Sequence, residues 1–125
     1  MSIAEASVTA EPANLEDLFQ RCLGNMDLVE RVLLAFESHF EQDLDELEAA
    51  LTTASPNLAA QIAHRMKGAS SNVAAMALTR ELTSMEKLAR NEQMPEAFAC
   101  MGRLRGEWQR FLDADKDFAD YRNNN

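Results

Sequence analysis

The residues best suited to chemistry lie in one short segment, residues 63–71, which reads AHRMKGASS. In a helix, His64 and Lys67 stand one turn apart on the same face. An imidazole offers a nitrogen that can accept and return a phosphoryl group near neutral pH, and an ammonium group beside it can offset the phosphoryl charge. This spacing predicts a surface histidine that carries a phosphoryl group.

The rest of the segment predicts which way His64 faces. At about 100° per residue, an apolar stripe falls opposite His64 and should pack into the protein. That stripe consists of Leu58, Ile62, Met66, Ala69 and Val73. The neighbours expected around His64 are Asn57, Ala60, Gln61, Lys67, Gly68 and Ser71. Most of these are small, so we expect an open surface that another protein can approach, with Ala60, Gln61, Gly68 and Arg65 as docking positions.

Glycine at position 68 also favours an approach by a partner. A glycine inside a helix costs about 1 kcal/mol relative to alanine, and the apolar stripe continues beyond it. A bare backbone at Gly68 leaves room for a group docking on the imidazole, although it can alternatively loosen or end the helix. Ser71 is a candidate donor to the phosphoryl group, whereas Ser70 is interpreted as ordinary polar surface.

A histidine that reacts through one ring nitrogen needs an acceptor for the other. Glu86 is the candidate, because it follows Met85 in the apolar stripe of the next predicted helix, which can pack beside the His64 helix. An ordinary carboxylate on the flank of that helix is an equal alternative. The other histidine, His39, lies among acidic residues without a Lys-Gly neighbour and is interpreted as incidental.

The remainder of the chain predicts the helices that must position these residues. Only 4 Gly and 3 Pro occur in 125 residues, which favours helix. Apolar spacing predicts a short helix capped by Asn14, then helices over 27–53, 55–74 and 78–91, and a last one that uses Phe98 to Leu112. The fold class expected is all-α, an antiparallel up-and-down four-helix bundle with a short additional N-terminal helix. Residues 1–13 are expected to be a flexible N-terminal tail, 14–115 the bundle and 116–125 a polar C-terminal tail.

Charge excludes some partners and suggests others. A net charge of −9 argues against nucleic acid and anionic membranes. No acidic residue lies between Glu48 and Glu81, a stretch that contains Arg65, Lys67 and Arg80. This predicts a basic face for an acidic partner. The acidic run of the long helix is instead expected to be solvated; it consists of Glu37, Glu41, Asp45 and Glu48.

Targeting and cysteine usage point to the cytoplasm. The first residues show no secretory signal, and no apolar run approaches the ~18 residues of a membrane span. Cys22 and Cys100 are far apart and form no Cys-x-x-Cys motif, so we expect two reduced thiols. The chain is expected to be a cytoplasmic monomer.

The segment resembles the histidine-containing phosphotransfer (HPt) domains of two-component phosphorelays. His64, Lys67, Gly68 and Ser70 carry the pattern H-x-x-K-G-x-S, and the resemblance covers about residues 15–112. Val73 and the segment from Leu82 to Leu88 around Glu86 also match. Many family members have glycine in the turn after the motif, where this chain has Val73-Ala74-Ala75, which leaves the geometry of that turn open.

The resemblance implies that His64 is phosphorylated, through Nε2, while Lys67 steadies the phosphate and Glu86 holds the ring. It implies partners that are receiver domains, of a hybrid histidine kinase on one side and a response regulator on the other. No ATP-binding motif is present, so the chain is expected to be a relay intermediate and not an enzyme. No cofactor or metal is expected, because any Mg²⁺ would belong to the receiver.

Three other functions are alternatives to this one. A metal-binding bundle needs inward Glu-x-x-His pairs, but Gln61 stands three residues before His64. A hydrolase needs an exposed, strained nucleophile, which Ser70 and Ser71 on one helix do not supply. The main alternative is a regulatory bundle that docks on receiver domains without transferring phosphate.

Overall fold

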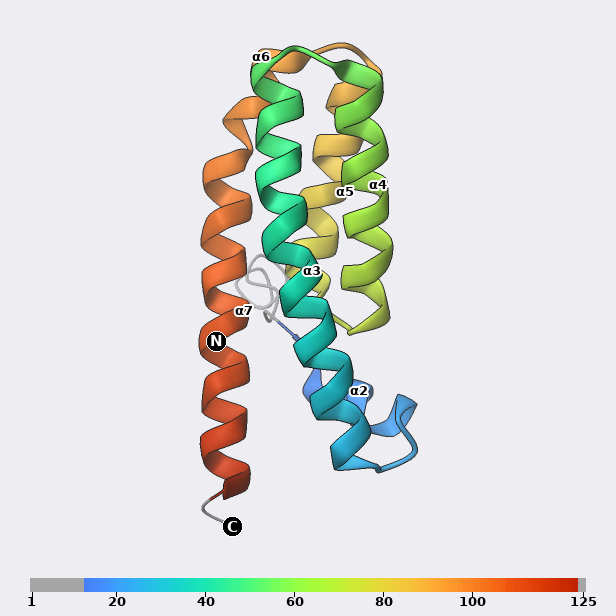
Figure 1. Cartoon of the computed structure of the whole chain (residues 1–125), viewed down its shortest axis with the longest axis vertical. Coiled ribbons are helices and arrows are strands. Elements are labelled where there is room, and N and C mark those ends of the chain that lie inside the picture. The colour runs from blue at the N-terminus through green and yellow to red at the C-terminus, as the bar shows by residue number, and fades with distance from the viewer. Residues whose placement is uncertain (1–12, 124–125) are drawn as a thin grey trace, which may run out of the picture.

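The computed structural model describes residues 13–123, and its side chains through residue 120. The expected flexible tail therefore lies outside the described residues except for Ala13. The described residues form α2 (Leu15–Arg21), α3 (Met26–Thr52), α4 (Pro56–Asn72), α5 (Met76–Arg90), α6 (Met94–Ala99) and α7 (Met101–Asn123), and residues 13–123 contain no strand. This confirms the all-α class. In Figure 1, the four long helices α3, α4, α5 and α7 lie side by side, and α2 lies near the N-terminal end of α3.

Asparagine side chains begin the first two helices. The Oδ1 atom of Asn14 accepts a hydrogen bond of 3.0 Å from the amide of Asp17, as its predicted N-cap role requires. Asn25 does the same for the amide of Leu28 at 3.1 Å and so separates α3 from α2. Helix α4 begins at Pro56, where the missing N–H costs nothing.

Four helices end in a left-handed residue that is not glycine. Leu23, Ala54, Ala74 and Glu92 have φ angles of 57°, 52°, 59° and 57°. After α4, the amide of Ala75 donates a hydrogen bond of 2.9 Å to the carbonyl of Ser70. This is the bond of a Schellman motif, in which the left-handed residue is usually glycine. The turn that the sequence left open is therefore left-handed at Ala74, a conformation that favours glycine.

The last predicted helix is two helices. Helix α6 ends at Ala99 and α7 begins at Met101. Because Ala97 and Cys100 face the core, three residues apart, Phe98 points outward and is 45% exposed. Its expected place in the core was wrong.

Helix α7 also runs farther than expected. The segment 116–125 was interpreted as a polar tail, but the helix continues to Asn123. Phe118 supplies the reason, because it is partly buried and packs against the core. Residues 124–125 lie outside the described part of the chain.

The core of the bundle holds an aromatic cluster between α3 and α7. The rings of Phe40 and Trp108 stack with centroids 4.1 Å apart, and Phe36 meets Phe111 edge-on at 5.2 Å. This contact aligns α7 along α3 and determines which face of α3 is covered.

As a result, the acidic face of α3 is not simply solvated, contrary to expectation. Glu41 accepts a hydrogen bond from Nε1 of Trp108 at 2.8 Å, and Glu48 accepts one from Arg105 at 2.6 Å. Glu37 is half-buried, and only Asp45 of the four is exposed without a recorded partner among the described residues. Helix α7 packs on this side of α3, so its donors reach the carboxylates.

Candidate functional site

His64 lies on the exposed side of α4, and Glu86 lies beneath it on α5. The His64 side chain is 63% exposed and the Glu86 side chain 9%. Nδ1 of His64 lies 3.1 Å from Oε2 of Glu86 and 3.3 Å from Oε1. Helix α4 packs more extensively against α5 than against any other helix, which brings the two residues together.

Glu86 also contacts two cations. Nζ of Lys67 lies 2.8 Å from Oε1. Nε and Nη2 of Arg90 lie 2.9 Å and 2.7 Å from Oε2. The Glu86 carboxylate therefore accepts hydrogen bonds from three side chains. His64 and Lys67 lie on successive turns of α4, and Arg90 lies one turn after Glu86 on α5.

These contacts keep Glu86 ionised. Burial by itself raises the pKa of this carboxyl, but the hydrogen bonds from Lys67 and Arg90, with the charges of Lys67 and His64, outweigh it and lower the pKa to about 2. An ionised carboxylate can only accept hydrogen bonds. Nδ1 of His64 must therefore carry the hydrogen, and in the neutral ring this leaves the lone pair on Nε2, which is the free nitrogen of the exposed ring.

Gly68 stands beside His64 in the middle of α4. The helix continues past it to Asn72, so the alternative that glycine ends the helix is wrong. A Cβ added at this position would meet no atom within 4 Å. Packing within the chain therefore does not require glycine here, and the space outside it is open.

The other predicted site residues divide into two groups. Gln61 is exposed one turn before His64, and Arg65 is exposed beside it, as expected. Arg65, however, donates to Asp43 at 2.8 Å and to Glu46 at 3.3 Å, so the expected basic face is partly neutralised by α3.

Three residues differ from the prediction in their burial or in their distance from His64: Ala60, Ser71 and Leu58. Ala60 is only 1% exposed, contrary to its placement on the open face. It precedes Lys67 by two turns on the side that faces α5, where a small side chain permits close packing. Ser71 is exposed but lies two turns, or about 10 Å, from His64. Leu58 of the predicted buried stripe is 49% exposed, near the start of α4.

Ser70 has a structural role. It is fully buried, and its hydroxyl donates to the carbonyl of Met66 at 2.8 Å. The serine of the H-x-x-K-G-x-S pattern therefore bonds within its own helix and does not face the imidazole, and its interpretation as polar surface was wrong.

Arg90 is the site residue that the sequence interpretation missed. It stands four residues after Glu86, and an acid followed by a base at this spacing on a helix is a signal for an ion pair. The pair is half-buried, with 56% of the Arg90 side chain and 9% of the Glu86 side chain exposed.

A groove of about 320 Å³ runs between α3 and α4 on the side of Arg65. Phe36, Phe40, Met66 and Val73 supply its apolar lining. His39 lies at its edge and donates from Nδ1 to the carbonyl of Ala35 at 2.8 Å. The second histidine thus borders a surface next to the His64 helix.

Two further properties of the described residues concern metal binding and membranes. Within residues 13–120, no three His, Cys, Asp or Glu side chains gather in a way that could hold a metal ion. None of the described helices has the length and apolar character needed to cross a membrane. Cys22 and Cys100 are both buried and free.

The fold and the H-x-x-K-G segment match a known family. The family model of the Hpt domain matches residues 31–114, and the chain belongs to this family. A solved structure, histidine-containing phosphotransfer protein B (HptB) from Pseudomonas aeruginosa PAO1, superposes with a TM-score of 0.78 at 24% identity, over 87% of this chain and 96% of that one. Among curated proteins, none matches the chain significantly. The protein is thus a histidine phosphotransfer protein of the kind that works in phosphorelays.

Proposed function

We propose that His64 is the phosphorylated residue and that the chain relays a phosphoryl group between aspartates of receiver domains, from a hybrid sensor kinase to a response regulator. One observation carries this proposal. His64 combines an exposed Nε2 with an Nδ1–H held by the buried Glu86, and Lys67 stands one turn away.

The transfer follows from this geometry. The lone pair on Nε2 attacks the phosphorus of a receiver's aspartyl phosphate, the bond from phosphorus to the aspartate oxygen breaks, and the aspartate leaves as a carboxylate. The ring becomes positively charged, and Glu86 offsets this charge through Nδ1–H. Attack by a second receiver's aspartate on the phosphorus breaks the new P–N bond and returns the ring to its starting state.

Lys67 is assigned to the phosphoryl oxygens. Its side chain is 29% exposed, and its ammonium group is bonded to Glu86 on the same face as the imidazole. A lysine has a flexible stem and three donors, so it can turn from Glu86 toward a phosphoryl group on Nε2. Arg90 would then remain on Glu86 and keep that carboxylate ionised and in place.

The receiver domain is assigned to the groove between α3 and α4 and to the open backbone at Gly68. The groove is apolar, and Gln61 and Arg65 flank it on α4 with exposed side chains. The proposal assigns any Mg²⁺ to the receiver, requires no cofactor of this chain, and describes a cytoplasmic monomer. A role for Ala60 or Ser71 in docking or in phosphate binding is not included, because neither lies beside the imidazole.

A transfer experiment tests the proposal. The purified chain is mixed with a receiver domain charged with radiolabelled phosphate, beside the His64→Gln variant and the control His39→Gln. The control removes the other histidine, which lies at the edge of the docking groove, so it is scored for labelling and not for rate. We expect label on the wild type and on the control, acid-labile and base-stable, and none on His64→Gln. Receivers that bind the chain without labelling it would support the docking-only function, and equal labelling of His64→Gln would contradict the assignment of His64.

A further inference from the structure

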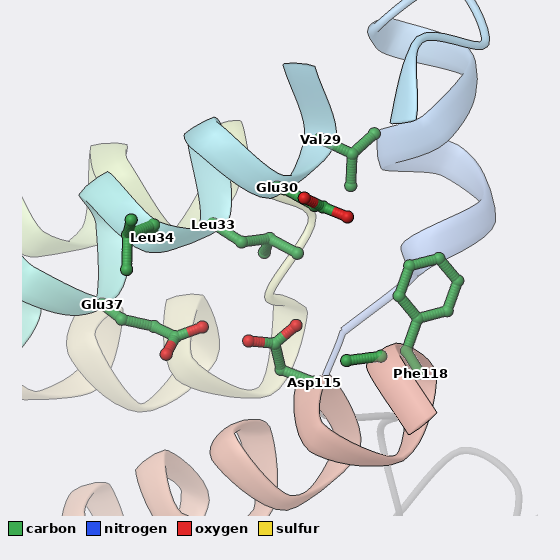
Figure 2. A pocket seen from close by; sticks show the side chains of 8 residues that line it. Val29, Glu30, Leu33, Leu34, Glu37, Asp115 and Phe118 are labelled. Atoms are coloured by element: carbon green, nitrogen blue, oxygen red, sulfur yellow. The ribbon is translucent and has the colours of Figure 1, made fainter. Parts of the chain in front are cut away.

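A second pocket lies away from His64, between the N-terminal half of α3 and the C-terminal half of α7. The pocket has a volume of about 260 Å³ and is shown in close-up in Figure 2. None of its lining residues lines the groove at the His64 helix. Its walls include apolar side chains from both helices, among them Leu33, Leu34 and Phe118, and Leu34 is 70% exposed. The pocket therefore offers apolar contact area at the surface of the chain.

Two carboxyl groups face each other across this pocket. Glu37 points from α3 and Asp115 from α7, each toward the other (Figure 2), and they share a hydrogen bond. Burial, the bond to Asp115 and the charges of Asp115 and Glu41 raise the pKa of Glu37 to about 8. At neutral pH, therefore, the two carboxyl groups share a proton.

A further carboxylate lies near the pair. Glu41 lies one turn along α3, and its charge contributes to the raised pKa of Glu37. In the part of the chain whose side chains are described, no Lys or Arg lies within ion-pair distance of Glu37 or Asp115. A shared proton takes the place that a cation would fill.

We propose that this pocket docks a segment of a partner protein that presents one lysine or arginine between aliphatic side chains. The cationic head would lie between Glu37 and Asp115, and its apolar stem and neighbours would pack on Leu33, Leu34 and Phe118. The pocket and the groove at the His64 helix are separate surfaces, so a partner bound here leaves the imidazole accessible. The proposal does not depend on which residue is phosphorylated.

Docking of the cation expels the proton. The proton leaves the pair for solvent, because a cation between the two carboxyls favours both in the ionised form. By linkage, the affinity should rise up to about tenfold per pH unit below pH 8 and level off above it. A segment held by apolar contacts alone would show no such dependence.

The probe for the test is the peptide acetyl-Leu-Arg-Leu-amide, with acetyl-Leu-Gln-Leu-amide as its uncharged match. Each is titrated into the full chain while NMR follows the methyl groups of Leu33, Leu34 and Ala119, at pH 6 and pH 8. We expect saturable shifts with the arginine peptide only, and tighter binding at pH 8. The Asp115→Asn variant should lose about tenfold in affinity, whereas Asp117→Asn, which makes the same charge change on an exposed position of α7, should not.

Three outcomes would overturn the proposal. They are no saturation at the pocket methyls, equal binding of the glutamine peptide, or equal affinity at the two pH values. The wild-type titrations do not depend on any variant, and thermal unfolding of Asp115→Asn checks that a lost affinity does not reflect a lost fold.

Discussion

Nδ1 of His64 lies 3.1 Å from Oε2 of Glu86, although the two residues stand on different helices and 22 positions apart. The carboxylate is buried, ionised and bonded to two cations, so it can present only an acceptor to the ring. This relationship assigns the hydrogen to Nδ1 and the free lone pair to the exposed Nε2. Which ring nitrogen reacts is thus decided by a residue on α5 that does not itself react.

Replacing Glu86 with glutamine should remove this selection. A glutamine side chain can accept or donate, so both neutral tautomers of His64 become populated. Nitrogen-15 NMR of the ring should show Nδ1–H in the wild type and a mixture in Glu86→Gln. We expect phosphoryl uptake to slow by about 10- to 100-fold, the loss typical of removing the carboxylate partner of a metal-binding histidine. The control is Glu81→Gln on the same helix. An unchanged ring spectrum in Glu86→Gln would contradict the argument.

The same carboxylate should contribute to acid stability. Its pKa in the folded chain is about 2 and its ordinary value 4.5. Because the folded value is the lower one, the contribution is complete above pH 4.5 and is lost as the pH falls toward 2. The difference corresponds to about 3 kcal/mol. Urea unfolding of the wild type and of Glu86→Gln should show stabilities that converge in this range; parallel curves would show that Glu86 does not titrate there.

The sequence predicted the part of the site that is local to one helix. The spacing of His64, Lys67 and Gly68 alone places them together, and periodicity predicts α3, α4 and α5 within a few residues. The sequence could not decide whether Glu86 contacts His64 or is an ordinary carboxylate on the flank of its helix. The apolar periodicity of each helix does not determine the angle at which the two helices pack.

Positions that depend on a neighbouring helix were harder to predict. Ala60 is small, and a small side chain suits an open surface and close helix packing equally well. Glu41 and Glu48 were predicted to be solvated because their hydrogen-bond donors lie about 60 residues away in sequence. These donors are Trp108 and Arg105, respectively. Phe98 was misplaced because no Gly or Pro marks the end of α6 at Cys100, so the sequence did not indicate that a new helix begins there.

Arg90 should act as a positioning residue through Glu86. The Arg90→Gln variant loses two hydrogen bonds to Oε2, so Glu86 becomes less fixed and Lys67 remains as its cation. We expect slower phosphoryl uptake and a ring spectrum between those of the wild type and Glu86→Gln. The control Lys87→Gln removes the same charge from an exposed neighbour on α5 and should change neither.

A double variant sharpens this prediction. If Arg90 and Lys67 both hold Glu86, losing both should cost more than the sum of the single losses, in a double-mutant cycle of uptake rates. Strict additivity would show that Arg90 contributes only a surface charge.

Gly68 allows stability and docking to be separated. Since a Cβ there meets nothing within 4 Å, Gly68→Ala should raise the stability by about 0.5–1 kcal/mol through helix propensity. Gly68→Gln should also fold, but its long side chain stands next to His64 and should weaken receiver binding and slow transfer. Thermal unfolding and calorimetric titration with a receiver measure the two effects. Loss of stability in Gly68→Ala would contradict the open space, and unimpaired binding of Gly68→Gln would move the docking surface elsewhere.

The left-handed alanine after α4 should be a site of stored strain. Ala74 has a φ of 59°, and a Cβ in this conformation costs roughly 1–2 kcal/mol. Ala74→Gly removes that cost, but it loosens the unfolded chain by about 0.4–1 kcal/mol and, because Ala74 is buried, it also loses a methyl group worth about 0.8 kcal/mol. The net expectation is a stability close to that of the wild type, measured by urea unfolding. The matched control is Ala89→Gly inside α5, which should destabilise because its helical conformation gains nothing from glycine and a buried methyl group is lost. Similar destabilisation in both variants would mean that Ala74 does not hold the left-handed conformation in solution.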